Sequence, residues 1–80
     1  MPAGNASNLE NRIRDLRLER GLTQEQLGQA VGLTRQSIIA IEKGRFTPSI
    51  HTVLVLARAL GAPVERLFWL NERDRSGDGK

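Results

Sequence analysis

The sequence predicts a compact all-α domain of five helices. Three observations support this: apolar residues recur at helical spacing, Ser, Thr and Gly stand at positions typical of helix caps and stops, and no segment shows the strict alternation of a half-buried strand. The chain has 80 residues, enough for one small core. We therefore expect one domain over residues 9–70, preceded by a disordered segment, 1–8, and followed by a disordered tail, 71–80.

Composition excludes several classes of function. Lys and Arg number 12 against 9 acidic residues, a mild excess that suits nucleic acid without demonstrating it. Cysteine is absent and His51 is the single histidine, so we expect no disulfide, no metal site and no cofactor. We find no catalytic triad and no phosphate-cradling glycine loop, so we expect no enzyme. No apolar run approaches the ~20 residues of a membrane span, which favours a cytoplasmic protein without membrane partners.

The first helix should run from Leu9 to Arg20. Ser7 stands at the cap position and Gly21 at the stop. One face of this helix carries Leu9, Ile13, Leu16 and Arg20.

The stretch from Thr23 to Glu42 predicts two short helices joined by a tight turn at Gly32. Thr23 and Gln26 have the spacing of a capping box, and Thr34 can cap the second helix. The inward side chains should be Leu27, Val31, Leu33, Ile38 and Ile41. The second helix opens with three polar side chains, Arg35, Gln36 and Ser37, which is the kind of tip that a major-groove reader presents.

Two further helices should complete the domain. Ser49 caps a fourth helix over residues 50–60, and Pro63 suits the first turn of a fifth. On the fourth helix we expect the inward residues to be Ile50, Val53, Leu54, Ala57 and Leu60, with Leu56 beside them and Val55 exposed. On the fifth we expect Val64, Leu67 and Phe68 to face inward.

The pattern from Ile13 to Phe68 resembles the phage repressor and Cro-like (XRE-like) helix-turn-helix family. The matching stretches are IRDLRLERGLTQEQL, VGLTRQSIIAIEKGRFTPS, VLARALG and VERLF. The resemblance implies a five-helix, lambda-repressor-like DNA-binding domain whose helix-turn-helix is formed by helices 2 and 3. It also implies binding to double-stranded DNA, usually as a dimer on a two-fold operator.

The resemblance places the base-reading residues at the start of helix 3. Arg35 can make two hydrogen bonds to guanine, and Gln36 can make two to adenine, with Ser37 beside them. The alternative is that both only approach phosphates. Ile39 stands where the family usually has a polar residue, so it could contact a thymine methyl or pack against its neighbours. Ala40 offers only a methyl group.

The resemblance also assigns backbone contacts. Gln24 corresponds to a phosphate-binding glutamine at a helix N-terminus, where free N–H groups favour an anion. Thr23 beside it either contacts phosphate as well or acts only as a cap. The remaining predicted phosphate contacts are Thr34, Lys43, Arg45, Thr47 and Ser49.

Two structural features follow from the same resemblance. Arg17 should pair with Glu42 and brace helix 3, the recognition helix, against helix 1. The alternative is two unrelated surface charges. Gly28 stands where the family usually has alanine, and it keeps the small side chain that close helix crossing needs.

The last prediction concerns assembly. Trp69 and Leu70 lie off the inward stripe of helix 5, and with Val55 they could form a homodimer surface. Alternatively, Trp69 covers the domain's own core.

Taken together, the sequence predicts a sequence-specific DNA-binding transcriptional regulator. We expect a homodimeric repressor in the cytoplasm that joins the nucleoid when it is bound to DNA. The alternative is a protein-interaction module, such as the antitoxin partner of a toxin.

Overall fold

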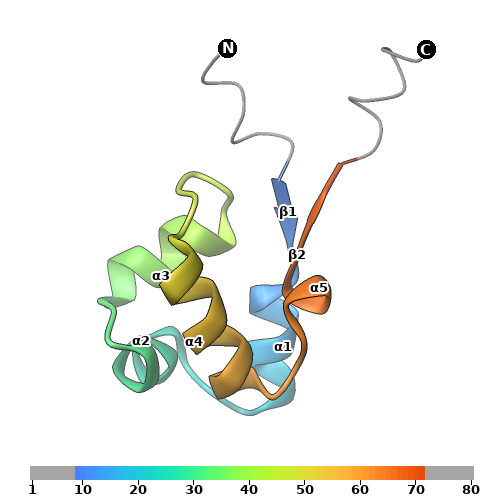
Figure 1. The fold of residues 1–80 in the computed structure, drawn as a ribbon. Coiled ribbons are helices and arrows are strands. Elements are labelled where there is room, and N and C mark those ends of the chain that lie inside the picture. Colours follow the sequence, from blue (N-terminus) through green and yellow to red (C-terminus); the bar gives the residue numbers. More distant parts are fainter. Residues whose placement is uncertain (1–8, 72–80) are drawn as a thin grey trace, which may run out of the picture.

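The computed structural model describes residues 9–71, and the expectations for residues 1–8 and 72–80 lie outside this range. The helices are α1 (Ile13–Glu19), α2 (Gln24–Val31), α3 (Arg35–Glu42), α4 (Ile50–Leu60) and α5 (Val64–Leu67) (Figure 1). Two short strands are added to them, β1 (Leu9–Asn11) and β2 (Phe68–Leu70). The five helices are confirmed, and the fold is mostly helical with one small sheet. Within residues 9–71, no helix is both long and apolar enough to cross a bilayer.

The two strands form an antiparallel ribbon that extends from the helical body (Figure 1). Leu9 lies opposite Leu70 and Asn11 opposite Phe68, and the N–H of Arg12 donates to the carbonyl of Leu67 at 2.9 Å. The expectation that helix 1 starts at Leu9 is therefore wrong, because residues 9–11 are extended. The apolar, aromatic segment 68–70 favours a strand. It supplies the backbone hydrogen-bond partners for residues 9–11, and the sequence around Leu9 cannot predict partners so distant along the chain.

The helix-turn-helix forms as its caps predict. The Thr23 hydroxyl accepts from the N–H of Gln26 at 3.0 Å, and the Gln26 side chain accepts from the N–H of Thr23 at 2.9 Å, which closes a capping box. Gly32 ends α2 in the left-handed region with φ of 77°, where a side chain would be strained. The Thr34 hydroxyl then caps α3 by accepting from the N–H of Ser37 at 3.1 Å.

Each of the five helices contributes apolar side chains to one core. The buried apolar residues of this core are Ile13, Leu16, Leu27, Ile38, Ile41, Leu56, Leu60 and Leu67. Half-buried apolar residues surround this set, among them Leu22, Val31, Leu33 and Phe68. Helix α3 is thus anchored by its apolar side, which leaves its polar tip at the surface.

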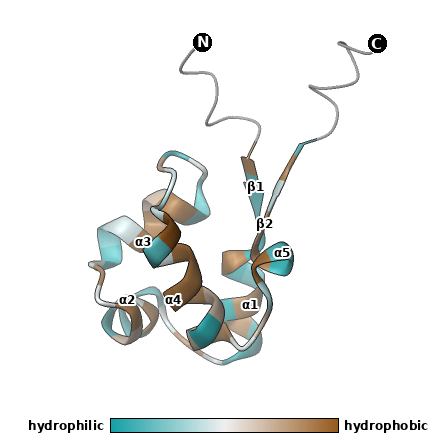
Figure 2. Ribbon diagram, viewed as in Figure 1, coloured by the Kyte–Doolittle hydropathy of each residue, from teal (hydrophilic) through white to brown (hydrophobic). Residues whose placement is uncertain are grey.

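The predicted inward face of α4 is partly wrong. Ile50 is 75% exposed and Leu54 is 56% exposed, whereas Leu56, expected beside the stripe, is fully buried. Most residues of α4 are apolar, so helical spacing fits more than one face (Figure 2). The helix is rotated so that Leu56 and Leu60 enter the core, which leaves Ile50 and Leu54 on its outer side.

Gly28 lies against the turn itself. A Cβ built at Gly28 would lie 2.6 Å from the carbonyl oxygen of Leu33, closer than real Cβ contacts. The same turn is closed by a 2.8 Å hydrogen bond from the N–H of Leu33 to the carbonyl of Gly28. Glycine therefore permits the turn to sit directly on α2, and an added methyl group would push on backbone atoms.

We expect Gly28→Ala to lower the free energy of unfolding by about 1–2 kcal/mol. The strain of an overpacked contact, typically about 1–3 kcal/mol, exceeds the helix-propensity gain of about 0.5–1 kcal/mol. Urea denaturation measures the change, with Gln29→Ala on the exposed side of α2 as the control. A Gly28→Ala variant more stable than the wild type would contradict this.

Candidate nucleic-acid interface

The recognition helix α3 is held to α1 by a buried ion pair. The Nε of Arg17 lies 2.7 Å from Oε2 of Glu42, and their side chains are 8% and 4% exposed. Arg17 also donates to the carbonyl of Leu22 at 2.9 Å. This supports the bracing role predicted for Arg17 and Glu42 over the alternative of two unrelated surface charges.

Gln24, at the start of α2, joins the same network. Its side-chain N–H donates to Oε1 of Glu42 at 3.2 Å, and Nη2 of Arg17 donates to the same oxygen at 3.5 Å. The side chain predicted to hold phosphate is thus already fixed by one hydrogen bond. Its second N–H and its carbonyl oxygen are left for a ligand, and the first N–H groups of α2 add to them.

The polar tip of α3 lies at the surface as predicted. Arg35 and Gln36 are exposed, and Ser37 is half-buried. The hydroxyl of Thr34 donates to the oxygen of Ser37 at 3.1 Å, which fixes both hydroxyls beside the first turn. Ile39 and Ala40 are half-buried, so their apolar side chains remain within reach of a ligand on this helix.

The connection between α3 and α4 presents two further cations. Lys43, Arg45 and Thr47 are all exposed. Ser49 is exposed as well, but its hydroxyl caps α4 by accepting from the N–H of Thr52 at 3.1 Å. The predicted clamp residues therefore lie at the surface between the end of the recognition helix and the first turn of α4.

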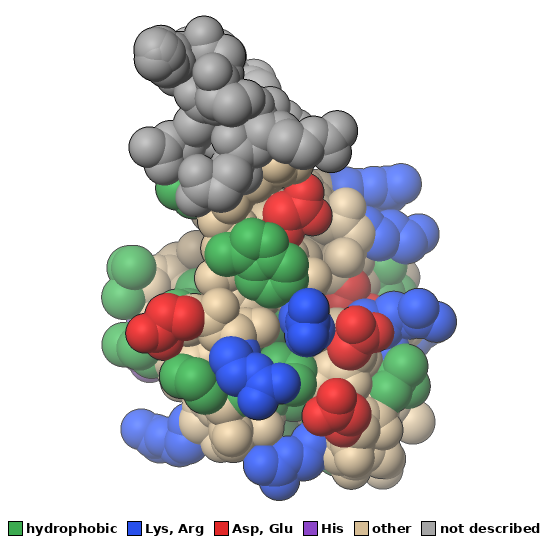
Figure 3. Space-filling model, turned by 90° about the vertical axis from the view of Figure 1, so that its right-hand side faces the viewer, with side chains coloured by type: hydrophobic (Ala, Val, Ile, Leu, Met, Phe, Trp, Pro, Cys, Tyr) green, Lys and Arg blue, Asp and Glu red, His purple; other side chains and the backbone are tan. Residues whose placement is uncertain are grey.

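Within the segment of residues 34–49, which holds α3 and the connection after it, the exposed charges are all positive. From residue 34 to 49 the chain carries the three cations Arg35, Lys43 and Arg45 and one acid, Glu42. Because Arg17 neutralises Glu42, the one acid of this segment does not offset its three cations. The face that carries the ribbon and α5 differs, since acidic and basic side chains are interspersed on it (Figure 3).

Comparison with known proteins assigns the family. The helix-turn-helix family model matches residues 13–67, which are most of the chain. The chain belongs to this helix-turn-helix family. It is 41% identical over 66 residues to an uncharacterized HTH-type transcriptional regulator, YgzD of Bacillus subtilis, covering 82% of this chain and 100% of that protein.

Two further relatives are informative. The transcriptional repressor RstR of cryptic phage CTXphi from Vibrio cholerae is 40% identical over 57 residues, which are 71% of this chain and 51% of RstR. The crystal structure of the restriction-modification controller protein C.AhdI from Aeromonas hydrophila superposes with a TM-score of 0.66 at 38% identity, covering 70% of this chain and 85% of that one. The relatives are named as transcriptional regulators and repressors, so this chain is a member of a DNA-binding regulator family.

Two side chains support this helix-turn-helix in ways that the sequence patterns did not reveal. Asn11 donates from its side-chain amide to the carbonyl of Ile41 at 3.0 Å, so β1 touches the end of α3. Arg20 donates from Nε to the carbonyl of Leu60 at 3.2 Å and so closes the end of α4. The signal for Asn11 was present, because Asn two residues before a helical run is typical of a helix start.

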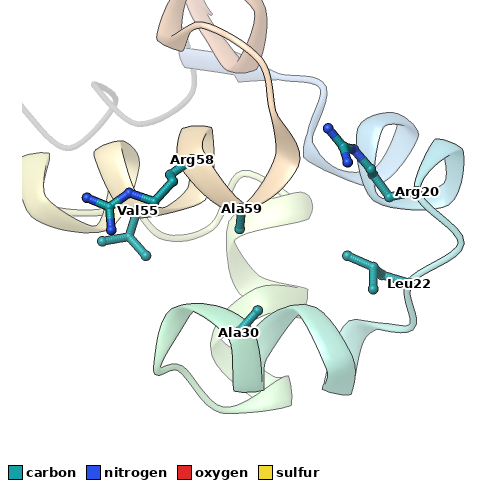
Figure 4. Close-up of a pocket in the computed structure, with 6 residues that line it drawn as sticks. All are labelled: Arg20, Leu22, Ala30, Val55, Arg58 and Ala59. Carbon is teal, nitrogen blue, oxygen red and sulfur yellow. The ribbon is translucent and has the colours of Figure 1, made fainter.

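The residues proposed for a dimer surface lie at two separate places. The expectation that Val55 is exposed is wrong, because it is half-buried and lines a hollow of about 520 Å³ between α2 and α4 (Figure 4). The other residues around this hollow are Arg20, Leu22, Ala30, Arg58 and Ala59. Trp69 and Leu70 lie on the ribbon, 40% and 51% exposed, and the guanidinium of Arg12 lies 5.6 Å from the centre of the Trp69 ring. The Trp69 ring is thus partly exposed and has Arg12 beside it.

We expect Arg17→Met to lower the free energy of unfolding by about 3 kcal/mol, because it leaves the Glu42 carboxylate buried without its cation. Chemical denaturation measures the loss. The double variant Arg17→Met, Glu42→Leu should recover most of it, since no buried charge remains. If both single and double variants unfolded like the wild type, the pair would not brace α3.

Proposed function

We propose that this protein is a sequence-specific transcriptional repressor that binds double-stranded DNA as a homodimer on a two-fold operator. The observation that carries the proposal is the presentation of α3: a buried ion pair holds its last residue, exposed Arg35 lies on its first turn, and exposed Lys43 and Arg45 follow its last turn. The relatives named as phage repressors support repression, and the mechanism is steric, since a bound dimer occludes a promoter.

Base reading rests on Arg35 and Gln36. Both side chains are exposed on the first turn of α3, where a recognition helix contacts base edges. Arg suits guanine and Gln suits adenine, each through a bidentate pair. Ser37, Ile39 and Ala40 offer a hydroxyl and apolar contacts to thymine methyl groups, so the list of hydrogen-bonded bases is short.

Phosphate contacts fix the register of that helix. The helix N-termini at Thr23–Gln24 and Thr34, and the connection from Lys43 through Arg45 and Thr47 to Ser49, flank α3 on the chain. Exposed cations there attract the backbone regardless of sequence. We assign these residues to positioning and the tip of α3 to reading.

The outward face of α4 favours a homodimer. Ile50 and Leu54 are four residues apart on one face and exposed, and Phe46 in the preceding connection is 47% exposed. A helix that is apolar on both sides needs a partner on its outer side. A second copy of the chain supplies the same apolar pair, Ile50 and Leu54, with Arg58 one turn further along the helix, and a C2 pairing is self-complementary. The ribbon residues Trp69 and Leu70, and Val55 in the hollow, form the alternative surface.

The proposal is tested by selecting duplexes from a random pool with the purified protein. We expect enrichment of a two-fold motif whose half-sites lie about 34 Å apart, one turn of DNA. Binding should weaken steeply with added salt. A protein that enriched no duplex but copurified with a second protein would instead be a protein-interaction module.

We expect Arg35→Ala with Gln36→Ala to reduce affinity for the selected duplex by about 30-fold or more, since each lost bidentate pair is worth about 1–3 kcal/mol. Fluorescence anisotropy measures the affinity, and circular dichroism checks the fold. The matched control is Arg14→Ala with Gln29→Ala, which removes the same two residue types from exposed positions off α3. Full discrimination in the Arg35, Gln36 variant would refute the assignment of the reading residues.

We expect Leu54→Lys to shift the protein toward monomer, because a charge on the outer face of α4 would be desolvated in the dimer. Sedimentation velocity measures the shift. Leu18→Lys is the matched control, since Leu18 on α1 is 53% exposed, close to the 56% of Leu54. If Trp69→Ala dissociated the protein while Leu54→Lys did not, the interface would lie on the ribbon.

A further inference from the structure

Asn11, the last residue of β1, connects two helices through one side chain. Its Oδ1 accepts from the N–H of Ile13 at 3.1 Å, at the start of α1. Its Nδ2 donates to the carbonyl of Ile41 at 3.0 Å, in the last turn of α3 and 30 positions away in the sequence. The side chain is therefore directed by a local bond on one side and reaches the recognition helix on the other.

The bond to Ile41 complements the ion pair at the next residue. Arg17 holds Glu42 by the carboxylate at the end of its side chain. Asn11 instead holds a backbone carbonyl, which moves only with the helix itself. Together they tie the last two residues of α3 to the N-terminal part of the chain, one by backbone and one by side chain.

The ribbon sets the place of Asn11. Asn11 lies opposite Phe68 in the β1–β2 register, and the neighbouring N–H of Arg12 donates to the carbonyl of Leu67. The position of the Asn11 amide thus depends on the pairing of two chain segments that lie outside the helix-turn-helix. Phe68, packed against the core, links that pairing to the domain interior.

We infer that Asn11 is a positioning residue for DNA reading, which holds α3 through the carbonyl of Ile41 and so couples the ribbon to the recognition helix. The inference rests on the proposed DNA-binding function. A small tilt of α3 would move the Arg35 and Gln36 side chains relative to base edges, whereas contacts to the uniform phosphate backbone would adapt. Loss of the bond should therefore weaken specific binding more than non-specific binding.

The test is Asn11→Ser in the full chain. The serine hydroxyl can still accept from the N–H of Ile13, as in a Ser/Thr turn, but it ends one atom short of the reach to Ile41. We expect affinity for the duplex selected by the wild type to fall about three- to tenfold, the loss of one hydrogen bond, with affinity for a scrambled duplex unchanged. Anisotropy is measured at a temperature where circular dichroism shows both proteins fully folded.

Two variants make the result decisive. Glu10→Ser is the matched control, because Glu10 is in the same strand and its side chain bonds only Asn71 among the residues that the structure describes, so its specific-to-scrambled ratio should equal the wild type's. Asn11→Asp keeps an acceptor for the N–H of Ile13 but has no donor for the carbonyl of Ile41, so it should also lower the ratio of specific to scrambled affinity. This variant replaces Asn11→Ser in the test if the serine variant does not fold. An unchanged ratio in the folded variants, even with a lower melting temperature, would overturn the inference. Failure of the wild type to bind any duplex would instead refute the proposed function.

Discussion

The buried contact between Arg17 and Glu42 is the interaction on which the recognition helix depends. The two side chains lie 2.7 Å apart and are almost fully removed from solvent. Removing either one alone would destabilise the fold, because the other would remain as a buried charge without a partner. The pair also satisfies the carbonyl of Leu22 and recruits Gln24. One contact therefore fixes α1, the start of α2 and the end of α3 relative to one another.

The same contact shapes the electrostatics of the surface. Glu42 is the single acid between residues 34 and 49, and Arg17 reaches it from the inside of the domain. The cations of α3 and of the connection to α4 therefore face solvent without an opposing charge from their own segment. A net charge of only +3 for the chain understates the attraction that this one face offers to phosphate.

The second constraint is the size of the core. Eight apolar side chains are buried in the part of the chain that the structure describes, and α4 cannot place all of its apolar residues among them. Ile50 and Leu54 are left outside, on the helix that follows the cationic connection. Association through that face would complete the burial of α4 and fix the distance between two recognition helices, so stability and operator spacing would share one surface.

Local chemistry predicted much of this structure, and contacts distant in sequence account for what it missed. The caps at Thr23, Thr34 and Ser49 and the left-handed Gly32 depend on neighbours within a few residues, and the structure confirms them. The Arg17–Glu42 pair was predicted through the family resemblance.

The ribbon could not be found in this way, because three-residue strands are too short for a periodic pattern and their pairing joins the two ends of the domain. The face of α4 escaped prediction for another reason: an almost wholly apolar helix has no single preferred side. Because the ribbon was not predicted, half-buried Asn11 fell inside the predicted first helix, which begins two residues later at Ile13.

Mapping backbone amide shifts by NMR while the selected duplex is added tests the central claim most directly. The account predicts that the shifts concentrate at residues 23–24, 34–40 and 43–49, with smaller changes reaching Asn11 and Arg17 through their contacts with α3. The account would be contradicted if α3 were unaffected and the shifts were centred on the hollow around Arg20 and Arg58, or on strand β2 of the ribbon.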